Sequence, residues 1–335
     1  EILNVAGGAV VIFRNAFNLF IDNFKLNYKY LLYKIIVVLL TVGLSAALIV
    51  PNISFIFSSA ELSTLVGLFK DFFDAIAKGD TEFLAGFSER LTAAVADMGT
   101  LLQSKTSNIV FTAVSAVVIL LVSKFLGGMG NFTLGSLLDD RLSSYANTSF
   151  SGAFIKNLGK SSLWQLFYVP VTFVYDVLVI LLCYAFFLLM LAVFQVGVIA
   201  TLAALMLSVT LFVGSQAIKL TFANSMVPAI VTDRQKMGKA IKKGFRASLD
   251  GFGKMFSTYL VTCYLIMGLN ILAALVTFGS ALLITIPSSY LLLVCIQFVS
   301  YYTSEKKKYF VAADKIVVPE ETRKDENFYD NISIN

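Results

Sequence analysis

The chain has 335 residues, of which 58% are hydrophobic and 14% are charged. Roughly a quarter of the residues in ordinary soluble domains are charged, so this composition excludes a typical soluble fold. The net charge of +5 does not indicate a nucleic-acid-binding protein, because the lysines and arginines flank apolar segments instead of forming a separate basic domain. The apolar segments are continuous and long enough, at about 20 residues, for a helix to cross a membrane. We therefore predict an all-α polytopic membrane protein.

Residues 1–52 predict a surface helix followed by the first span. In residues 11–27, phenylalanines recur at steps of three or four and polar residues occupy the other face, a pattern typical of an amphipathic helix at a membrane interface. Residues 31–50 have the length and composition of a span, and Pro51 closes them. Lys34 lies near the start of this span, and its side chain is long enough to reach back to the membrane surface.

Residues 53–107 form a polar excursion in which acidic residues outnumber basic ones. Two amphipathic helices are predicted here, joined by a turn at Lys78-Gly79-Asp80. We expect this helical hairpin to lie on the extracytoplasmic side, because lysine and arginine concentrate in the other connections. Its apolar stripes are too large to remain in water, so we predict contact with a protein partner or a second copy of the chain. The residues predicted for this contact are Phe69, Phe72, Phe73 and Phe83.

Residues 108–228 predict spans two to four. The second span is expected to end near Gly127-Gly128, where a glycine pair follows the apolar run. The later apolar run is too long for one crossing and right for two, so spans three and four are predicted to form a tight hairpin with a turn near residues 194–197.

A basic amphipathic helix is predicted over residues 229–254. Apolar residues recur at steps of three or four on one face, and bases fall on the other. Bases beside apolar spans are attracted to anionic lipid headgroups, at about 1 kcal/mol per residue near the surface. The alternative is that these bases only fix the orientation of the spans. The residues predicted to contact anionic lipid are Lys239, Lys242, Lys243, Arg246 and Lys254.

Residues 255–303 predict spans five and six, joined at Gly279-Ser280. Residues 304–335 form a polar tail, which we expect to be mobile. The lysines and arginines that flank the six spans fall in the N-terminal helix, in the connections after spans two and four, and after span six. Because such bases concentrate on the cytoplasmic side, we predict a multi-pass protein of the cell membrane with both termini in the cytoplasm.

Two sets of short segments predict an internal repeat. Three segments open an amphipathic helix before an odd-numbered span, and they are 16–21, 153–158 and 240–245. Three others follow the even-numbered spans and end in an acid followed by a base, and they are 136–141, 229–234 and 310–315. We interpret the chain as three copies of a surface helix plus a two-span hairpin. The alternative is that unrelated amphipathic helices resemble one another by their composition alone.

Three features around spans four to six resemble a known group of membrane proteins. They are the proline-containing exit Ser225-Met226-Val227-Pro228-Ala229-Ile230, the acid Asp233, and the basic helix Ala240-Ile241-Lys242-Lys243-Gly244-Phe245. Together they resemble uncharacterised bacterial six-span proteins related to the membrane domain fused to some glycerophosphodiester phosphodiesterases. The sequence lacks the histidines and metal-binding carboxylates that the phosphodiesterase domain would need. The resemblance therefore implies a bacterial six-span protein and carries over no catalytic residue.

The usual catalytic residue sets are not recognisable in this sequence. No histidine occurs, which removes the commonest general base and metal ligand. Cys183, Cys263 and Cys295 lie singly in apolar runs, which is typical of small buried apolar residues rather than of metal ligands. We therefore predict a non-enzymatic protein without a cofactor or metal.

Asp176 is the acid that lies deep within an apolar run, where an ionised carboxylate costs roughly 2.5 kcal/mol or more. One interpretation is that Asp176, together with Asn270, couples transport to a proton or another cation. The other is that Asp176 is hydrogen-bonded to its neighbours and only holds helices together. Two functions therefore stay open: a lipid-associated transport or accessory component of a membrane complex, and a proton- or ion-coupled transporter of small molecules.

Overall fold

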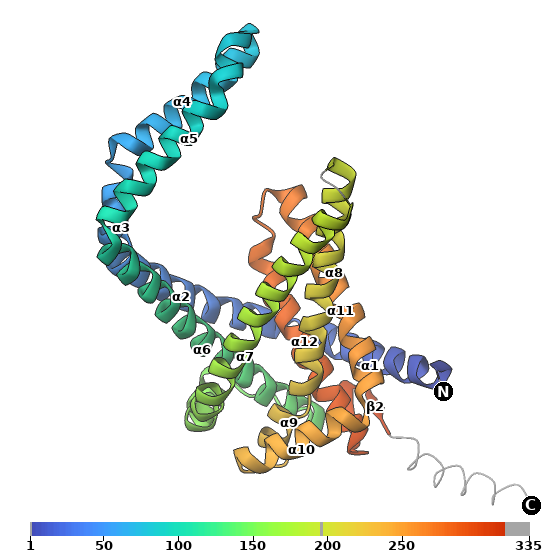
Figure 1. Cartoon of the computed structure of the whole chain (residues 1–335). Coiled ribbons are helices and arrows are strands. Elements are labelled where there is room, and N and C mark those ends of the chain that lie inside the picture. The colour runs from blue at the N-terminus through green and yellow to red at the C-terminus, as the bar shows by residue number, and fades with distance from the viewer. Residues whose placement is uncertain (1, 195–196, 319–335) are drawn as a thin grey trace, which may run out of the picture. The chain divides into compact units, whose positions relative to one another are not determined.

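The structure is a computed structural model that describes residues 2–194 and 197–318 (Figure 1). Six helical segments of this part of the chain are long and apolar enough to cross a membrane, which confirms the predicted all-α polytopic fold. The helices are α1 (Ile2–Asp22), α2 (Lys25–Leu48), α3 (Val50–Phe57), α4 (Ala60–Lys78), α5 (Thr81–Ser104), α6 (Thr106–Ser144), α7 (Phe150–Phe194), α8 (Val198–Ala223), α9 (Met226–Val231), α10 (Met237–Asp250), α11 (Phe252–Thr277) and α12 (Leu282–Ser304). The link 195–196 and the tail residues 319–335 lie outside the described residues.

The chain divides into two compact units, which are described separately. The larger unit comprises Glu1–Ile35 and Phe125–Asn335, and the smaller unit comprises Ile36–Lys124. The candidate spans are α2, α6, α7, α8 continued by α9, α11 and α12. Helices α3 and α4 would add a seventh span only if this pair, which is bent by 56°, crossed as one segment.

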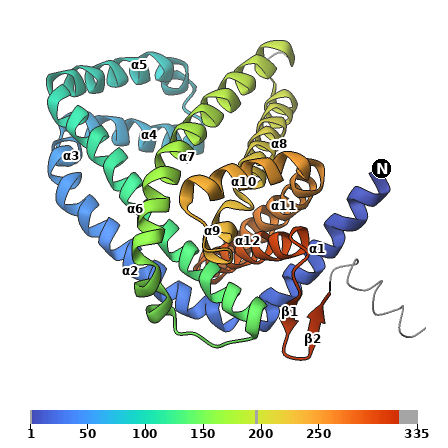
Figure 2. The same cartoon turned by 90° about the horizontal axis from the view of Figure 1, so that it is seen from below.

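The larger unit is built around α12, which lies between α7 and α1 in both views (Figures 1 and 2). In its most apolar window α12 is 44% buried, whereas the other five candidate spans are 6–22% buried. Nearly every side chain from Leu291 to Tyr302 is buried, so this half of the helix meets protein on all sides. Its core partners come from α1, α6 and the segment after α12, and they include Ile12, Ala16, Leu19, Leu134, Leu138, Tyr309 and Val311.

The first residues of the predicted mobile tail are ordered, which corrects part of that prediction. Strands β1 (Tyr309–Ala312) and β2 (Lys315–Val317) form an antiparallel hairpin, and β1 packs on α1. Tyr309 is buried, and the Asn15 amide of α1 donates a 3.1 Å hydrogen bond to its hydroxyl. Alternating burial along a four-residue strand is too short a pattern to stand out in a polar segment.

Helix α10 packs on the rest of the larger unit mainly through small residues, and the Phe245 ring also stacks on Phe222 of α8 with centroids 5.3 Å apart. Ala240, Gly244 and Ser248 recur every four residues and are buried, whereas Phe245 is 50% exposed. The Ser248 hydroxyl donates a 2.8 Å hydrogen bond to the Thr221 carbonyl near the end of α8. Small side chains let two helix backbones approach closely, which is how helices commonly pack in membranes. Of the large apolar residues of α10, Phe245 and Leu249 stay exposed.

The three predicted repeat copies use the same position for packing. Ala16, Ala153 and Ala240 are the first residues of the matched segments, and each is at most 1% exposed. Asn157 and Ser161 follow Ala153 at steps of four and are also buried, as Gly244 and Ser248 are after Ala240. The residues that these segments share therefore lie on the side of each helix that packs against protein.

Two predicted helix boundaries are wrong. Helix α6 runs without a break through Gly127-Gly128 as far as Ser144. Helix α7 likewise joins the predicted surface segment and the third span into one 45-residue helix that contains Pro170. The glycines of α6 serve close packing instead of a turn, because a Cβ atom at Gly130 would lie 2.5 Å from the Tyr33 ring and one at Gly135 would lie 2.7 Å from the Phe298 ring.

The smaller unit contains the predicted helical hairpin. Helix α4 ends at Gly79, whose φ of 71° is left-handed and suits glycine, and the Asp80 carboxylate accepts a 3.0 Å hydrogen bond from the Phe83 amide to cap α5. The turn at Lys78-Gly79-Asp80 is therefore confirmed. Ala75 and Ala94 are buried where the two helices approach.

Two glycines of α10 test the packing of this helix. A Cβ atom at Gly244 would lie 2.6 Å from the Met226 side chain and 3.1 Å from its backbone nitrogen, whereas one at Gly238 would meet nothing within 4 Å. We expect Gly244→Ala to destabilise the protein by about 1–3 kcal/mol through overpacking. Gly238→Ala is the matched control and should stabilise it by about 0.5–1 kcal/mol, because alanine favours the helix. Thermal unfolding in detergent measures both, and equal midpoints would contradict the packing described here.

Candidate functional site

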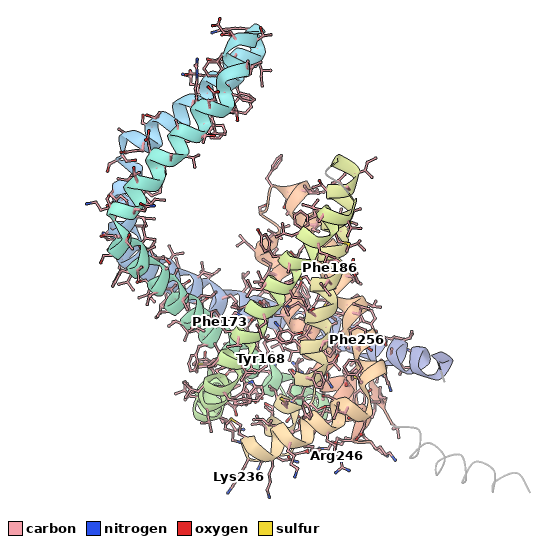
Figure 3. The ribbon with its side chains drawn as sticks, in the orientation of Figure 1. Tyr168, Phe173, Phe186, Lys236, Arg246 and Phe256 are labelled. Carbon is pink, nitrogen blue, oxygen red and sulfur yellow. The ribbon has the colours of Figure 1, made fainter. Side chains whose placement is uncertain are left out.

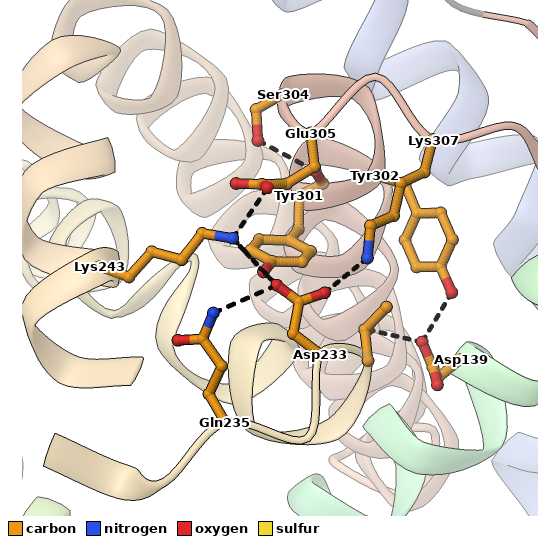
Figure 4. Close-up of polar contacts among 10 residues, drawn as sticks. Asp139, Asp233, Gln235, Lys243, Tyr301, Tyr302, Ser304, Glu305 and Lys307 are labelled. Carbon is orange, nitrogen blue, oxygen red and sulfur yellow. Dashed lines mark hydrogen bonds and ion pairs between the residues drawn. The ribbon is translucent and has the colours of Figure 1, made fainter. Parts of the chain in front are cut away.

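The densest polar cluster of the described residues lies at the C-terminal end of α12 (Figure 4). Asp233, in the link between α9 and α10, is its centre. The Lys307 ammonium donates to one carboxylate oxygen of Asp233 at 2.5 Å. The Lys243 ammonium of α10 donates to the other oxygen at 2.9 Å, and the Tyr301 hydroxyl donates to the same oxygen. Asp233 therefore ties α10, α12 and the turn after α12 together.

Asp139 of α6 holds the neighbouring position in this cluster. Its carboxylate accepts a 2.7 Å hydrogen bond from the Tyr302 hydroxyl and a 2.6 Å hydrogen bond from the Thr232 hydroxyl. Asp139 and Asp233 are thus bound by consecutive tyrosines of α12. Thr232 precedes Asp233 in the chain, so the two carboxylates are linked through adjacent residues on both sides.

Three carboxylates, those of Asp139, Asp233 and Glu305, lie in this cluster with two lysines. Lys243 also pairs with Glu305 at 2.8 Å, so two lysines meet the carboxylates of Asp233 and Glu305. Burial raises the pKa of Asp233, but hydrogen bonds from Lys307, Tyr301 and Lys243 outweigh it and lower this pKa to about 2. Burial lowers the pKa of Lys243, whereas bonds to Glu305, Tyr301 and Asp233 raise it above its ordinary value. Asp233 and Lys243 are therefore both charged at neutral pH.

We call this cluster the clamp, and its residues are Asp139, Asp233, Lys243, Tyr301, Tyr302, Glu305 and Lys307. The sequence predicted only some of them. Asp233 and Asp139 lie in the acidic ends of the predicted repeat segments, and this pattern is the feature of the sequence that singles them out. Tyr301 and Tyr302 lie within an apolar run and resemble ordinary interface tyrosines, and the lysine after them resembles a positive flank. Among the described residues, no group of three histidine, cysteine, aspartate or glutamate side chains is placed to hold a metal ion.

The bases predicted to contact lipid divide into two groups. Lys239, Lys242 and Arg246 are exposed on α10, and Arg246 points away from the helical bundle (Figure 3). Lys243 instead belongs to the clamp, and Lys254 is partly buried where it meets α1, since a Cβ atom at Gly8 would lie 2.7 Å from its side chain. The exposed bases share their surface with two exposed apolar side chains of α10, Phe245 and Leu249.

Asp176 has a basic partner that the sequence analysis did not assign. The Lys219 ammonium of α8 lies 2.7 Å from the Asp176 carboxylate of α7, and the Gln216 amide lies 3.4 Å from the same oxygen. The sequence feature that could have predicted this partner is Lys219 itself, which directly follows the apolar run. Asn270 is used elsewhere, because its amide donates to Ser289 at 3.2 Å and its oxygen accepts from Thr285 at 2.7 Å, both on α12.

The four phenylalanines predicted for a partner contact differ in exposure. The Phe72 ring packs on the Phe87 ring of α5 with centroids 4.3 Å apart. Phe83 is partly buried beneath the Arg90 guanidinium, which lies 4.7 Å from the centre of its ring. Phe69 and Phe73 are 46% and 66% exposed. Phe69 and Phe73 are therefore the two that this unit leaves open.

Comparison of the chain with protein-family models, with curated proteins and with solved structures gives no match. The fold and the site define an integral membrane protein with several spanning helices and a charged clamp at one end of its most buried helix.

The clamp predicts an acid-sensitive contribution to stability. Because the pKa of Asp233 is lowered from 3.8 to about 2 on folding, its contribution is complete above pH 4 and is lost as the pH falls toward 2. We expect Asp233→Asn to lower the free energy of unfolding by about 2 kcal/mol at pH 7 and by less at pH 3. The matched control is Asp314→Asn, at the equivalent position of the third repeat segment, where the acid is exposed.

The measurement is thermal unfolding in detergent at both pH values. A deficit for Asp233→Asn that stays the same at pH 7 and pH 3 would contradict an ionised carboxylate as the centre of the clamp. Equal deficits for the two variants would contradict it as well.

Proposed function

We propose that this protein is a non-enzymatic accessory component of a cell-membrane complex, which holds anionic lipid at its cytoplasmic face through α10. The observation that carries the proposal is the mixed surface of α10. Lys239, Lys242 and Arg246 are exposed beside Phe245 and Leu249, while the opposite side of the helix is fixed to α8 and α9. Bases that attract headgroups and apolar side chains that enter the acyl region together favour a helix in the interface plane.

The rigid attachment of α10 supports a specific role for this surface. A peripheral amphipathic helix leaves the membrane when its lipids change, whereas α10 is anchored by Ser248, Gly244 and the Lys243 pair. Its exposed bases are therefore presented at a constant position relative to the spans. We propose that this side is the cytoplasmic one, since the flanking lysines and arginines concentrate there. The resemblance to six-span bacterial membrane proteins around residues 225–245 agrees with this proposal.

The helical hairpin of the smaller unit supports the accessory part of the proposal. Its open phenylalanines, Phe69 and Phe73, share α4 with the exposed side chains of Val66 and Ile76. Exposed apolar side chains grouped on one helix are typical of a contact surface. We propose that this hairpin contacts a protein partner or a second copy of the chain.

The α10 surface predicts a preference for anionic lipid that three substitutions remove. With each base contributing about 1 kcal/mol, the combined variant Lys239→Gln, Lys242→Gln, Arg246→Gln should bind anionic lipid roughly 100-fold more weakly at low salt. Native mass spectrometry with phosphatidylglycerol against phosphatidylcholine measures this preference. The matched control replaces three bases of the smaller unit, Lys70→Gln, Lys78→Gln and Lys105→Gln. A similar loss in both variants would show that net charge alone, and not α10, determines lipid preference.

A coupled transporter is the second candidate, and the Asp176–Lys219 pair favours it. Both side chains are about one-fifth exposed, and they join two candidate spans by a direct ion pair. Protonation of the carboxylate would break this pair, and this is the step that would couple transport to a proton. The structural alternative is that the pair only joins α7 to α8, since removing one partner of a buried pair is itself destabilising.

Proton flux distinguishes the two roles of Asp176. In vesicles that contain a pH-sensitive dye, a coupled transporter should conduct protons under an imposed potential, and Asp176→Asn should reduce this flux at least about tenfold while the protein still folds. Asp250→Asn, at an exposed position of α10, is the control. Equal proton flux in the parent and in Asp176→Asn would contradict proton transfer through Asp176 and leave the pair a structural role.

A further inference from the structure

Lys34 of α2 is a positive charge within a candidate span, and no carboxylate of the described residues pairs with it. Its ammonium lies 5.2 Å from the centre of the Tyr30 ring and 4.7 Å from that of the Tyr290 ring. Among the described residues, no carboxylate or other hydrogen-bond acceptor pairs with this ammonium. Ring faces attract a cation, but they carry no net charge that could balance it. Lys219 differs in this respect, because its ammonium forms an ion pair with the Asp176 carboxylate.

The surroundings of Lys34 are fixed by hydrogen bonds between α2 and α6. The Tyr30 hydroxyl donates to the Asn131 side chain at 2.5 Å, and the Tyr33 hydroxyl donates to the Leu126 carbonyl at 2.7 Å. Gly127 of α6 makes room for the lysine, because a Cβ atom there would lie 2.9 Å from the Lys34 nitrogen. The ammonium is therefore held at a defined position between three helices, instead of moving freely at the end of a flexible chain.

The position opens toward the apolar surface of α12. Tyr290 is 37% exposed, and Ile286 and Leu283, which precede it by one and two turns, are 44% and 64% exposed. Tyr290 lies eight residues after the start of α12, or about 12 Å along the helix axis, so the ammonium is well inside the span. An anion that reaches Lys34 from this side crosses an apolar surface. A lipid can do so with its acyl chains on Leu283 and Ile286, whereas a dissolved anion would have to leave water.

We propose that Lys34 and Tyr290 form a binding site for the phosphate group of one phospholipid, whose acyl chains lie along the exposed face of α12. A phosphodiester carries the single negative charge that balances one ammonium, and charged hydrogen bonds of this kind are strong where water is scarce. Neither residue belongs to α10, so this site is separate from the headgroup surface of the proposed function and can fail or succeed independently of it.

The test is lipid binding to the purified full chain in an uncharged detergent. The probe is phosphatidylglycerol with two six-carbon chains, and the readout is the shift of the thermal unfolding midpoint with lipid concentration. We expect Lys34→Met to weaken binding at least about tenfold, and Lys34→Arg, which keeps the charge, to stay within about threefold of the parent. Lys29→Met is the matched control, because Lys29 is exposed on the same helix, and it should bind like the parent.

Two further ligands identify the part of the lipid that is recognised. Diacylglycerol with the same chains lacks the phosphate and should shift the midpoint little, and inorganic phosphate lacks the chains and should not compete. Equal binding by Lys34→Met and Lys29→Met would overturn the site, as would an equal response to diacylglycerol. Full competition by inorganic phosphate would overturn the assignment to lipid. If Lys34→Met does not fold, Tyr290→Leu should weaken binding at least about threefold, and unchanged binding would overturn the proposal.

Discussion

The larger unit depends on two carboxylates, Asp139 and Asp233, that are bound by consecutive tyrosines at the end of α12. An unpaired buried carboxylate is costly, so each acid fixes the element that carries it to this helix end. Asp139 fixes α6, and Asp233 fixes the link that leads into α10. Lys243 and Lys307 add opposite charges beside Asp233, so this carboxylate can lie partly buried.

A second constraint determines how the surface helices pack. Apolar helices in a lipid bilayer gain no hydrophobic free energy by associating, because lipid tails are as apolar as the helices. Close approach and hydrogen bonds must hold such helices instead. In α10 the small residues Ala240, Gly244 and Ser248 provide this approach, and Phe245 and Leu249 stay exposed. The exposed basic residues of α10 lie beside these two apolar side chains, which is the arrangement on which the proposed lipid contact rests.

Composition and periodicity predicted the candidate spans, the helical hairpin of the smaller unit and the turn at Gly79, because each depends on local sequence. The centrality of α12 was not predictable, since its apolar content is similar to that of its neighbours and only its packing distinguishes it. Gly127-Gly128 was predicted as a helix break, because sequence alone does not show that Lys34 of α2 lies against Gly127 and Gln165 of α7 against Gly128. The partner of Asp176 was missed for a similar reason, since Lys219 lies 43 residues away and only the packing of α7 on α8 joins them.

Cysteine accessibility in intact cells tests most directly whether the clamp and α10 face the cytoplasm. After replacement of Cys183, Cys263 and Cys295 by alanine, one cysteine is placed at Lys242 of α10 or at Lys78 of the outer hairpin, and a membrane-impermeant maleimide is added. We expect labelling at position 78 in intact cells and at position 242 only after permeabilisation. Labelling at position 242 in intact cells would contradict a cytoplasmic α10 and the lipid role proposed for it.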